Sequence, residues 1–136
     1  MRDLGLPGAW APRLLSLLRI VTGLIFLQHG AQKLLGVPPM AEGMSMPPAF
    51  SLFWFGGILE LFGGLLVMIG LFTRPVAFIL SGEMAVAYWM FHANQGLFPA
   101  LNGGDAAILY CFVFLYLAAA GPGPWSLDSW RARGRR

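Results

Sequence analysis

The stretch GGILELFGG, residues 56–64, decides how this chain folds. It lies inside an apolar segment of about residues 50–72, which is long enough to cross the roughly 30 Å hydrocarbon core of a bilayer. Two glycine pairs stand three and four positions before and after Glu60, so on a helix they share its face. Small residues on one face let a neighbouring helix approach to backbone distance. The stretch therefore predicts a membrane-spanning helix whose acidic face points into a helical bundle and away from lipid.

Three further apolar segments have similar lengths, at about residues 13–35, 75–93 and 105–121. Hydrophobic residues make up 57% of the chain and charged residues 11%, whereas soluble domains average about 45–50% and 25%. Arg19 interrupts the first segment and no small-residue cleavage site stands out, so we expect an uncleaved first span. The sequence predicts an all-α integral membrane protein, a four-helix bundle that forms one domain over residues 1–136.

The basic residues fall on one side of the predicted spans. Arg2 and Arg13 precede the first span, Arg74 lies between the second and third, and four more arginines end the chain: Arg131, Arg133, Arg135 and Arg136. The other two loops carry no arginine or lysine, apart from Lys33 at the lip of the first span. Cytoplasmic loops are enriched in lysine and arginine, so we expect both the N- and C-termini in the cytoplasm. The expected partner of the net charge of +3 is the membrane surface and not nucleic acid.

Three ionisable residues lie near the middle of three different spans: Arg19, Glu60 and Glu83. An ionisable side chain at this depth costs about 2.5–3.5 kcal/mol on insertion scales, so each needs a partner or a purpose. We expect Arg19 to form an ion pair with Glu60, Glu83 or both, inside the bundle. The carboxyl left over would hold a proton, as a quinone-reducing or proton-coupled site requires. Glu60, Glu83 and Arg19 are therefore the candidate catalytic residues.

A second group of polar residues lies toward the outer face. His29 and Lys33 are four residues apart on one helix face, and His92 and Asp105 stand at a similar level on the third and fourth spans. Together they predict a substrate-binding pocket for an anion or a quinone head group, with histidine as hydrogen-bond donor. Two structural alternatives remain open. Lys33 can snorkel to the interface, and Asp105 suits the first turn of its helix electrostatically.

The sequence contains no cofactor fingerprint, so we expect no bound cofactor or metal. Two alternatives stay open. His29 and His92 could be the axial ligands of a b-type haem, and the methionines of residues 40–46 could bind Cu(I). Cys111 is the only cysteine, and we expect it to pack in the apolar interior.

Six short motifs cover nearly the whole chain: LRI with Gly23 (residues 18–23), QHGAQKL (28–34), GILELFGG (57–64), GLFTR (70–74), NGGD (102–105) and GPGPWSLD (121–128). In this order they resemble the DoxX family of small four-span bacterial membrane proteins. The family's usual acid after the paired glycines is glutamate, so Asp105 departs from the pattern but keeps the charge.

The resemblance implies a redox-associated membrane subunit in the bacterial inner (plasma) membrane. The family is named for a membrane subunit associated with a thiosulfate:quinone oxidoreductase, and relatives are linked to sulfur metabolism and to quinone or oxidative stress. Quinone is then the expected substrate. The expected partners are the lipid bilayer, redox enzyme subunits and a second copy of the chain. Two alternative functions remain: a carrier of an anion or small molecule, and a non-catalytic scaffold for redox enzymes.

Overall fold

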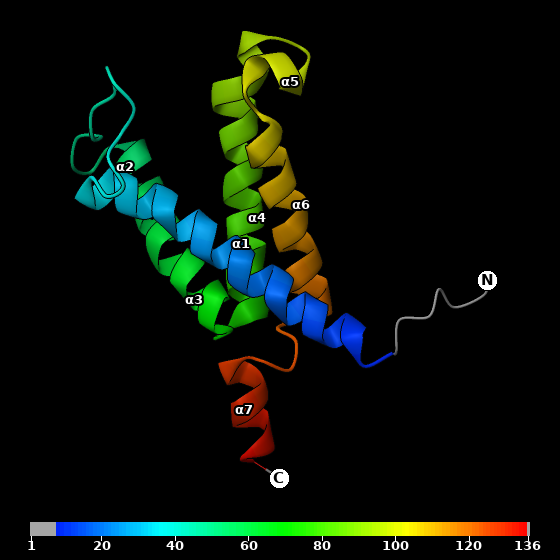
Figure 1. Ribbon diagram of the computed structural model, residues 1–136. Helices are drawn as coiled ribbons and strands as arrows, with labels where there is room; N and C mark the ends of the chain where they lie inside the picture. The colour runs from blue at the N-terminus through cyan, green and yellow to red at the C-terminus, as the bar shows by residue number, and fades with distance from the viewer. Residues whose placement is uncertain (1–7, 136) are drawn as a thin grey trace.

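The computed structural model describes residues 8–135, so Arg2 and Arg136 lie outside the described part. Within these residues the chain is all-helical and contains no strand (Figure 1). The first helix, α1, spans Trp10–Leu35. The second apolar segment is composite, because α2 (Leu52–Ile58), the π-helical turn η1 (Leu59–Gly63) and α3 (Gly64–Ile69) follow one another without a break.

The third apolar segment is composite as well. It consists of α4 (Thr73–Ala87), the π-helical turn η2 (Tyr88–His92) and the 3-10 turn η3 (Ala93–Gln95). The short helix α5 (Pro99–Asn102) lies in the next loop, α6 (Asp105–Ala120) returns along α4, and α7 (Leu127–Arg133) follows near the C-terminus.

These helices match the four predicted segments to within a few residues. In the described part of the chain, three stretches are long and apolar enough to cross a membrane: Trp10–Leu35, Leu52–Ile69 and Thr73–Gln95. The fourth, Asp105–Ala120, has 16 residues and is therefore about 24 Å long at 1.5 Å per residue. The all-helical membrane fold is confirmed, whereas the side on which the termini lie stays a prediction.

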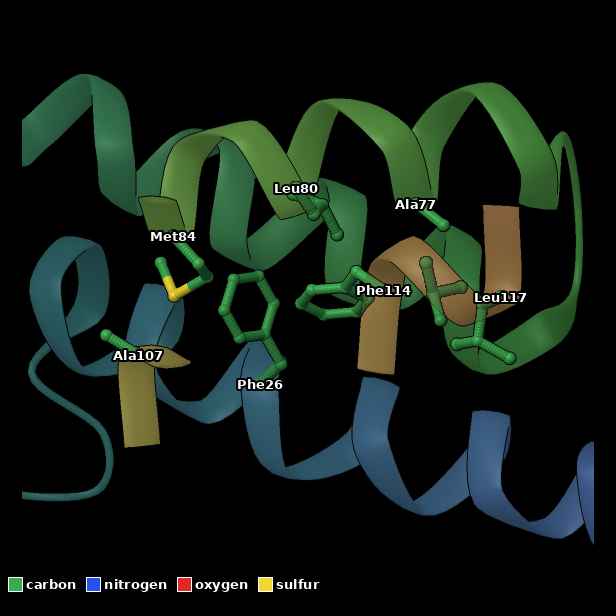
Figure 2. Packing of buried hydrophobic residues seen from close by; sticks show 8 residues of the cluster. Phe26, Ala77, Leu80, Met84, Ala107, Phe114 and Leu117 are labelled. Atoms are coloured by element: carbon green, nitrogen blue, oxygen red, sulfur yellow. The ribbon is translucent and has the colours of Figure 1, made fainter. Parts of the chain in front are cut away.

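The helices form two groups around a small apolar core. Helix α1 packs along α2, η1 and α3, and α4 packs along α6. In Figure 1 the two groups meet near the turn between α3 and α4 and splay apart toward α2 and α5. Figure 2 shows the core between them, where the ring of Phe26 meets Phe114 edge to face at 4.8 Å between centroids. Leu80 and Met84 of α4 close this core.

The glycines of residues 56–64 bring two helices close to the second segment, as the sequence predicted. A Cβ atom built at Gly64 would lie 2.8 Å from the backbone nitrogen of Leu27 in α1. One built at Gly63 would lie 2.7 Å from a methyl group of Leu80 in α4. Both distances are shorter than real Cβ contacts, so this packing requires glycine, which has no side chain, at positions 63 and 64. Glu60, between the glycine pairs, is only 4% exposed.

The predicted ion pair of Arg19 with Glu60 or Glu83 is wrong. Arg19 is fully buried, but all of its hydrogen bonds go to backbone carbonyl oxygens. Its Nε donates to Pro122 O at 2.7 Å, and its Nη1 donates to Val67 O at 2.7 Å. The remaining bonds reach the carbonyls of Met68 and Trp125.

The physical reason lies at the end of α3. The last carbonyl groups of a helix have no partner within the helix and carry partial negative charge. Arg19 satisfies two of these carbonyls and two more from the segment 122–125, so it joins α1, α3 and the chain after α6. Arg74 performs a similar role for α6, since its Nη1 donates to the carbonyls of Ala118 and Ala119.

Asp128 completes this end of the molecule. Its carboxylate accepts hydrogen bonds from the backbone N–H groups of Phe72 and Thr73, both at 2.9 Å, at the start of α4. Burial alone raises the pKa of Asp128, but the N–H donors and the charge of Arg131 outweigh burial, so its pKa lies below the usual value. These hydrogen bonds hold the segment GPGPWSLD (residues 121–128) against the turn between α3 and α4.

Candidate functional site

A cavity of about 620 Å³ lies between α1, the α2–η1 segment, α4 with η2, and the outer part of α6. Its walls are mainly apolar, and aromatic rings come from all four of these elements: Phe26, Phe53, Phe55, Phe91 and Tyr110. We call it the outer pocket, after the side of the membrane on which the sequence predicts the neighbouring loops.

The charged centre of the outer pocket is an ion pair between Lys33 and Glu60. Lys33 Nζ lies 2.8 Å from Glu60 Oε1, and the Glu60 side chain is almost fully buried. The stem of Lys33 passes over Gly57, where a built Cβ atom would lie 3.1 Å from Lys33 Cβ. The other carboxylate oxygen, Glu60 Oε2, is buried and has no hydrogen-bond partner among the described residues. An oxygen in this position is a ready acceptor for a ligand hydroxyl group.

Glu83 brings a second carboxyl group to the same pocket. Its Oε1 lies against Gly56, at 3.4 Å from a Cβ atom built there, and its buried Oε2 has no hydrogen-bond partner in residues 8–135. Two carboxyl groups and one ammonium therefore line the pocket. Lys33 balances the charge of the Glu60 carboxylate. The carboxyl group of Glu83 can therefore take up or release a proton while the Lys33–Glu60 pair stays neutral.

The two histidines line the pocket nearer the outer loops. His92 belongs to η2, and its Nδ1 lies 3.0 Å from the backbone carbonyl oxygen of Asn102. His29 is exposed, and its ring lies 6.1 Å from that of Tyr110, edge to face. The structure thus brings three of the four residues predicted for this pocket, His29, Lys33 and His92, around one cavity, and adds Glu60 and Glu83 to them. Their binding of a substrate stays a prediction.

Two of the candidate residues do not line the pocket. Arg19 lies in the N-terminal half of α1, among the carbonyls described above. Asp105 is exposed in the first turn of α6. A carboxylate is stabilised at a helix N-terminus, so the structural alternative for Asp105 explains its position. Lys33, by contrast, is held by Glu60 and does not simply snorkel to the interface.

Both π-helical turns of the described chain contribute to the pocket. The turn η1 supplies Leu59 and Glu60, and η2 supplies Phe91 and His92. A π-helical turn inserts one extra residue into a helix and rotates the side chains that follow it, and such turns are frequent at functional sites. The sequence carried no signal for either turn.

Sequence reasoning also missed Tyr110 and the role of Asn102. Tyr110 had no signal beyond being an aromatic residue in an apolar segment. Asn102 is 4% exposed and holds the outer loop together, since its Nδ2 donates to Gly96 O at 2.9 Å and its Oδ1 accepts from Gly104 N at 2.8 Å. Its position before two glycines was the only available signal.

Comparisons with known proteins agree with the membrane architecture. The DoxX family model matches residues 14–93. An uncharacterised protein of Haemophilus influenzae is 41% identical over 123 residues, covering 88% of this chain and 92% of its own. The inner membrane protein YphA of Escherichia coli is 32% identical over 132 residues, covering 89% and 92%.

A third relative carries a functional name. CatD of Bacillus subtilis, named as a candidate oxidoreductase, is 29% identical over 122 residues, covering 88% of each chain. No solved structure matches this one. The family match covers more than half of the sequence and includes most of α1 together with Glu60, Glu83 and His92. This chain therefore belongs to the DoxX family and is a multi-pass protein of the bacterial inner membrane.

Proposed function

We propose that this chain is a quinone-binding subunit of a membrane redox system, with the quinone ring bound in the outer pocket. The observation that carries the proposal is the pocket itself. It combines aromatic walls with the Lys33–Glu60 pair and two carboxylate oxygens that lack partners. Small-molecule sites are typically apolar cavities of about 300–1,000 Å³ with a few polar groups that fix orientation.

The chemistry of a quinone fits this combination. Reduction of a quinone to a quinol takes up two electrons and two protons, one at each ring oxygen. In the proposal, a partner redox protein supplies the electrons, and Glu60 and Glu83 transfer protons to and from the ring oxygens. Lys33 can donate a hydrogen bond to a ring carbonyl while it balances the charge of Glu60.

The position of the pocket supports the same ligand. Its walls come from helices that are apolar enough to cross a membrane, and quinones are themselves dissolved in the bilayer. The name of the relative CatD also favours a redox role. Association with redox enzyme subunits, or with a second copy of the chain, is part of this proposal.

A binding measurement on the purified protein in lipid nanodiscs tests it. We expect a short-chain ubiquinone or menaquinone analogue to bind saturably, and Glu60→Gln to weaken binding by about tenfold or more, because it removes the carboxylate and its pair with Lys33. Asp105→Asn is the matched control, since Asp105 is an exposed carboxylate outside the pocket. Its affinity should equal that of the unchanged protein.

Two results would contradict the proposal. The first is no saturable binding of either quinone analogue to protein that remains folded in nanodiscs. The second is equal weakening by Glu60→Gln and Asp105→Asn, which would place the ligand elsewhere. Flux of an organic anion across proteoliposomes that depends on Glu60, without quinone binding, would favour the carrier alternative instead.

A further inference from the structure

The hydrogen bond of His92 fixes which of its ring nitrogens carries a proton. Nδ1 lies 3.0 Å from the carbonyl oxygen of Asn102. A carbonyl oxygen can only accept, so Nδ1 must be the donor and must hold a hydrogen. In the neutral imidazole, Nε2 is then an unprotonated acceptor. The ring lines the outer pocket, and Nε2 makes no hydrogen bond with the described residues.

The loop that carries this carbonyl is itself held in place. Asn102 is buried, donates to Gly96 O, and accepts from Gly104 N through its side chain. The ring of Tyr88 stacks on that of His92, with 6.4 Å between centroids. The tautomer of His92 is therefore set by rigid structure. Asn102 itself does not line the cavity. It acts as a positioning residue, because its backbone oxygen holds the ring of His92.

Glu60 shows a similar arrangement. One of its oxygens, Oε1, is paired with Lys33 Nζ at 2.8 Å. The other, Oε2, is buried, has no partner in the described chain and can accept a hydrogen bond. In both Glu60 and His92, one polar atom has a partner within the chain, and the other is left as an acceptor.

The buried side-chain atoms of the pocket that lack a hydrogen-bond partner among the described residues are both carboxyl oxygens, Glu60 Oε2 and Glu83 Oε2. His92 Nε2 adds a further acceptor. The ammonium group of Lys33 donates one hydrogen to Glu60 and keeps two for a ligand oxygen. A ligand that fills the aromatic cavity and satisfies all of these atoms must supply hydroxyl groups, which both donate and accept. A ligand with two carbonyl groups would leave buried acceptors unpaired, which is costly.

We propose that the outer pocket prefers the reduced, dihydroxy form of its ligand, an aromatic diol such as a quinol, over the corresponding quinone. This inference rests on the proposed quinone-binding function and adds the redox form that the site selects. Preferential binding of the quinol raises the reduction potential of the bound couple. A tenfold difference in Kd corresponds to about 30 mV for a two-electron couple.

The test compares three probes built on the same tetramethyl ring, on the full-length protein in nanodiscs under anaerobic conditions. The probes are duroquinol, duroquinone and the dimethyl ether of duroquinol, which keeps the ring but has no hydroxyl donor. We expect the diol to bind at least tenfold more tightly than either of the others. His92→Phe should lower the ratio of quinone Kd to quinol Kd by threefold or more, and Asp105→Asn should leave it unchanged.

The outcomes separate this inference from the proposed function. If the quinone or the ether binds as tightly as the diol, the inference is overturned while the proposed function stands. If none of the three probes binds, both fall.

A second measurement covers the case in which His92→Phe does not fold. In ¹⁵N-histidine-labelled protein carrying His29→Gln, the Nε2 resonance of His92 should be that of an unprotonated nitrogen, and it should shift when the diol is added. A protonated Nε2 in the neutral ring, or no shift on diol binding, contradicts the assignment.

Discussion

Replacing Arg19 by methionine removes the guanidinium group while keeping an apolar stem of similar length. Four backbone carbonyls lose the guanidinium as a donor: those of Val67 and Met68 at the end of α3, and those of Pro122 and Trp125 after α6. A hydrogen bond to a charged group contributes about 1.5–3 kcal/mol. The four are not additive, because the segment 122–125 can move away and let water reach part of the set.

We therefore expect Arg19→Met to lower the free energy of unfolding by about 3–5 kcal/mol, as for other buried charged networks that lose one member. Arg19→Lys should be intermediate, since a single ammonium group cannot reach both helix α3 and the later segment. Equilibrium unfolding in mixed micelles, followed by circular dichroism, measures these differences. Arg13→Met, at an exposed arginine on the same helix, is the control and should leave stability unchanged.

The double variant decides between the two accounts of Arg19. Because no contact joins Arg19 to Glu60 in the described structure, the effects of Arg19→Met and Glu60→Gln should add to within about 0.5 kcal/mol. A coupling energy well above 1 kcal/mol between the two substitutions would instead support an ion pair of Arg19 with Glu60. A loss below about 1 kcal/mol for Arg19→Met would mean that the carbonyls find other donors, and would refute the reasoning.

Three further predictions concern packing, pH and orientation. Gly23→Ala should destabilise the protein by about 1–3 kcal/mol, because its Cβ would lie 2.6 Å from the backbone nitrogen of Met68. Gly82→Ala is the control and should not destabilise it, since a Cβ atom built at Gly82 has no neighbouring atom within 4 Å. Equal unfolding curves for the two variants would contradict this packing. The folded-state pKa of Asp128 lies below its usual 3.8, so its stabilisation should be complete above that pH and disappear as pH falls through the folded-state value. Unfolding curves of Asp128→Asn should lack this part of the acid dependence, and an unchanged acid profile would count against the Asp128 hydrogen bonds. A single cysteine at Met44, in a Cys111→Ser background, should react with an impermeant thiol reagent from the periplasm, and one near the C-terminus should not; labelling of both would overturn the cytoplasmic location of the termini.

The sequence was sufficient to predict the features that depend on composition and helical spacing. The four apolar segments, the burial of Glu60 and the close packing around Gly63 and Gly64 follow from hydrophobicity and from small residues on one helix face. The gathering of His29, Lys33 and His92 around one cavity followed from counting their depth along the predicted spans.

The pairing of the charges could not be predicted in this way. Backbone carbonyls exist at every position, so nothing in the sequence marked those of Val67 and Met68 as the partners of Arg19. The long side chain of Lys33 reaches back along the bundle to Glu60. A prediction based on depth alone placed Glu60 near the middle of the membrane and Lys33 toward its outer face. The π-helical turns shift the face on which later residues lie, and no local sequence signal encodes them.

Photoaffinity labelling with an azidoquinone tests the central claim, that the outer pocket is the quinone site, most directly. Protein in nanodiscs is illuminated with the probe, digested and mapped by mass spectrometry, with and without an excess of unlabelled quinone. We expect label that is displaced by the excess, on the pocket-lining parts of residues 52–60 and 82–92. Label spread over the lipid-facing surfaces of α1 and α6, and unaffected by the competitor, would contradict the account.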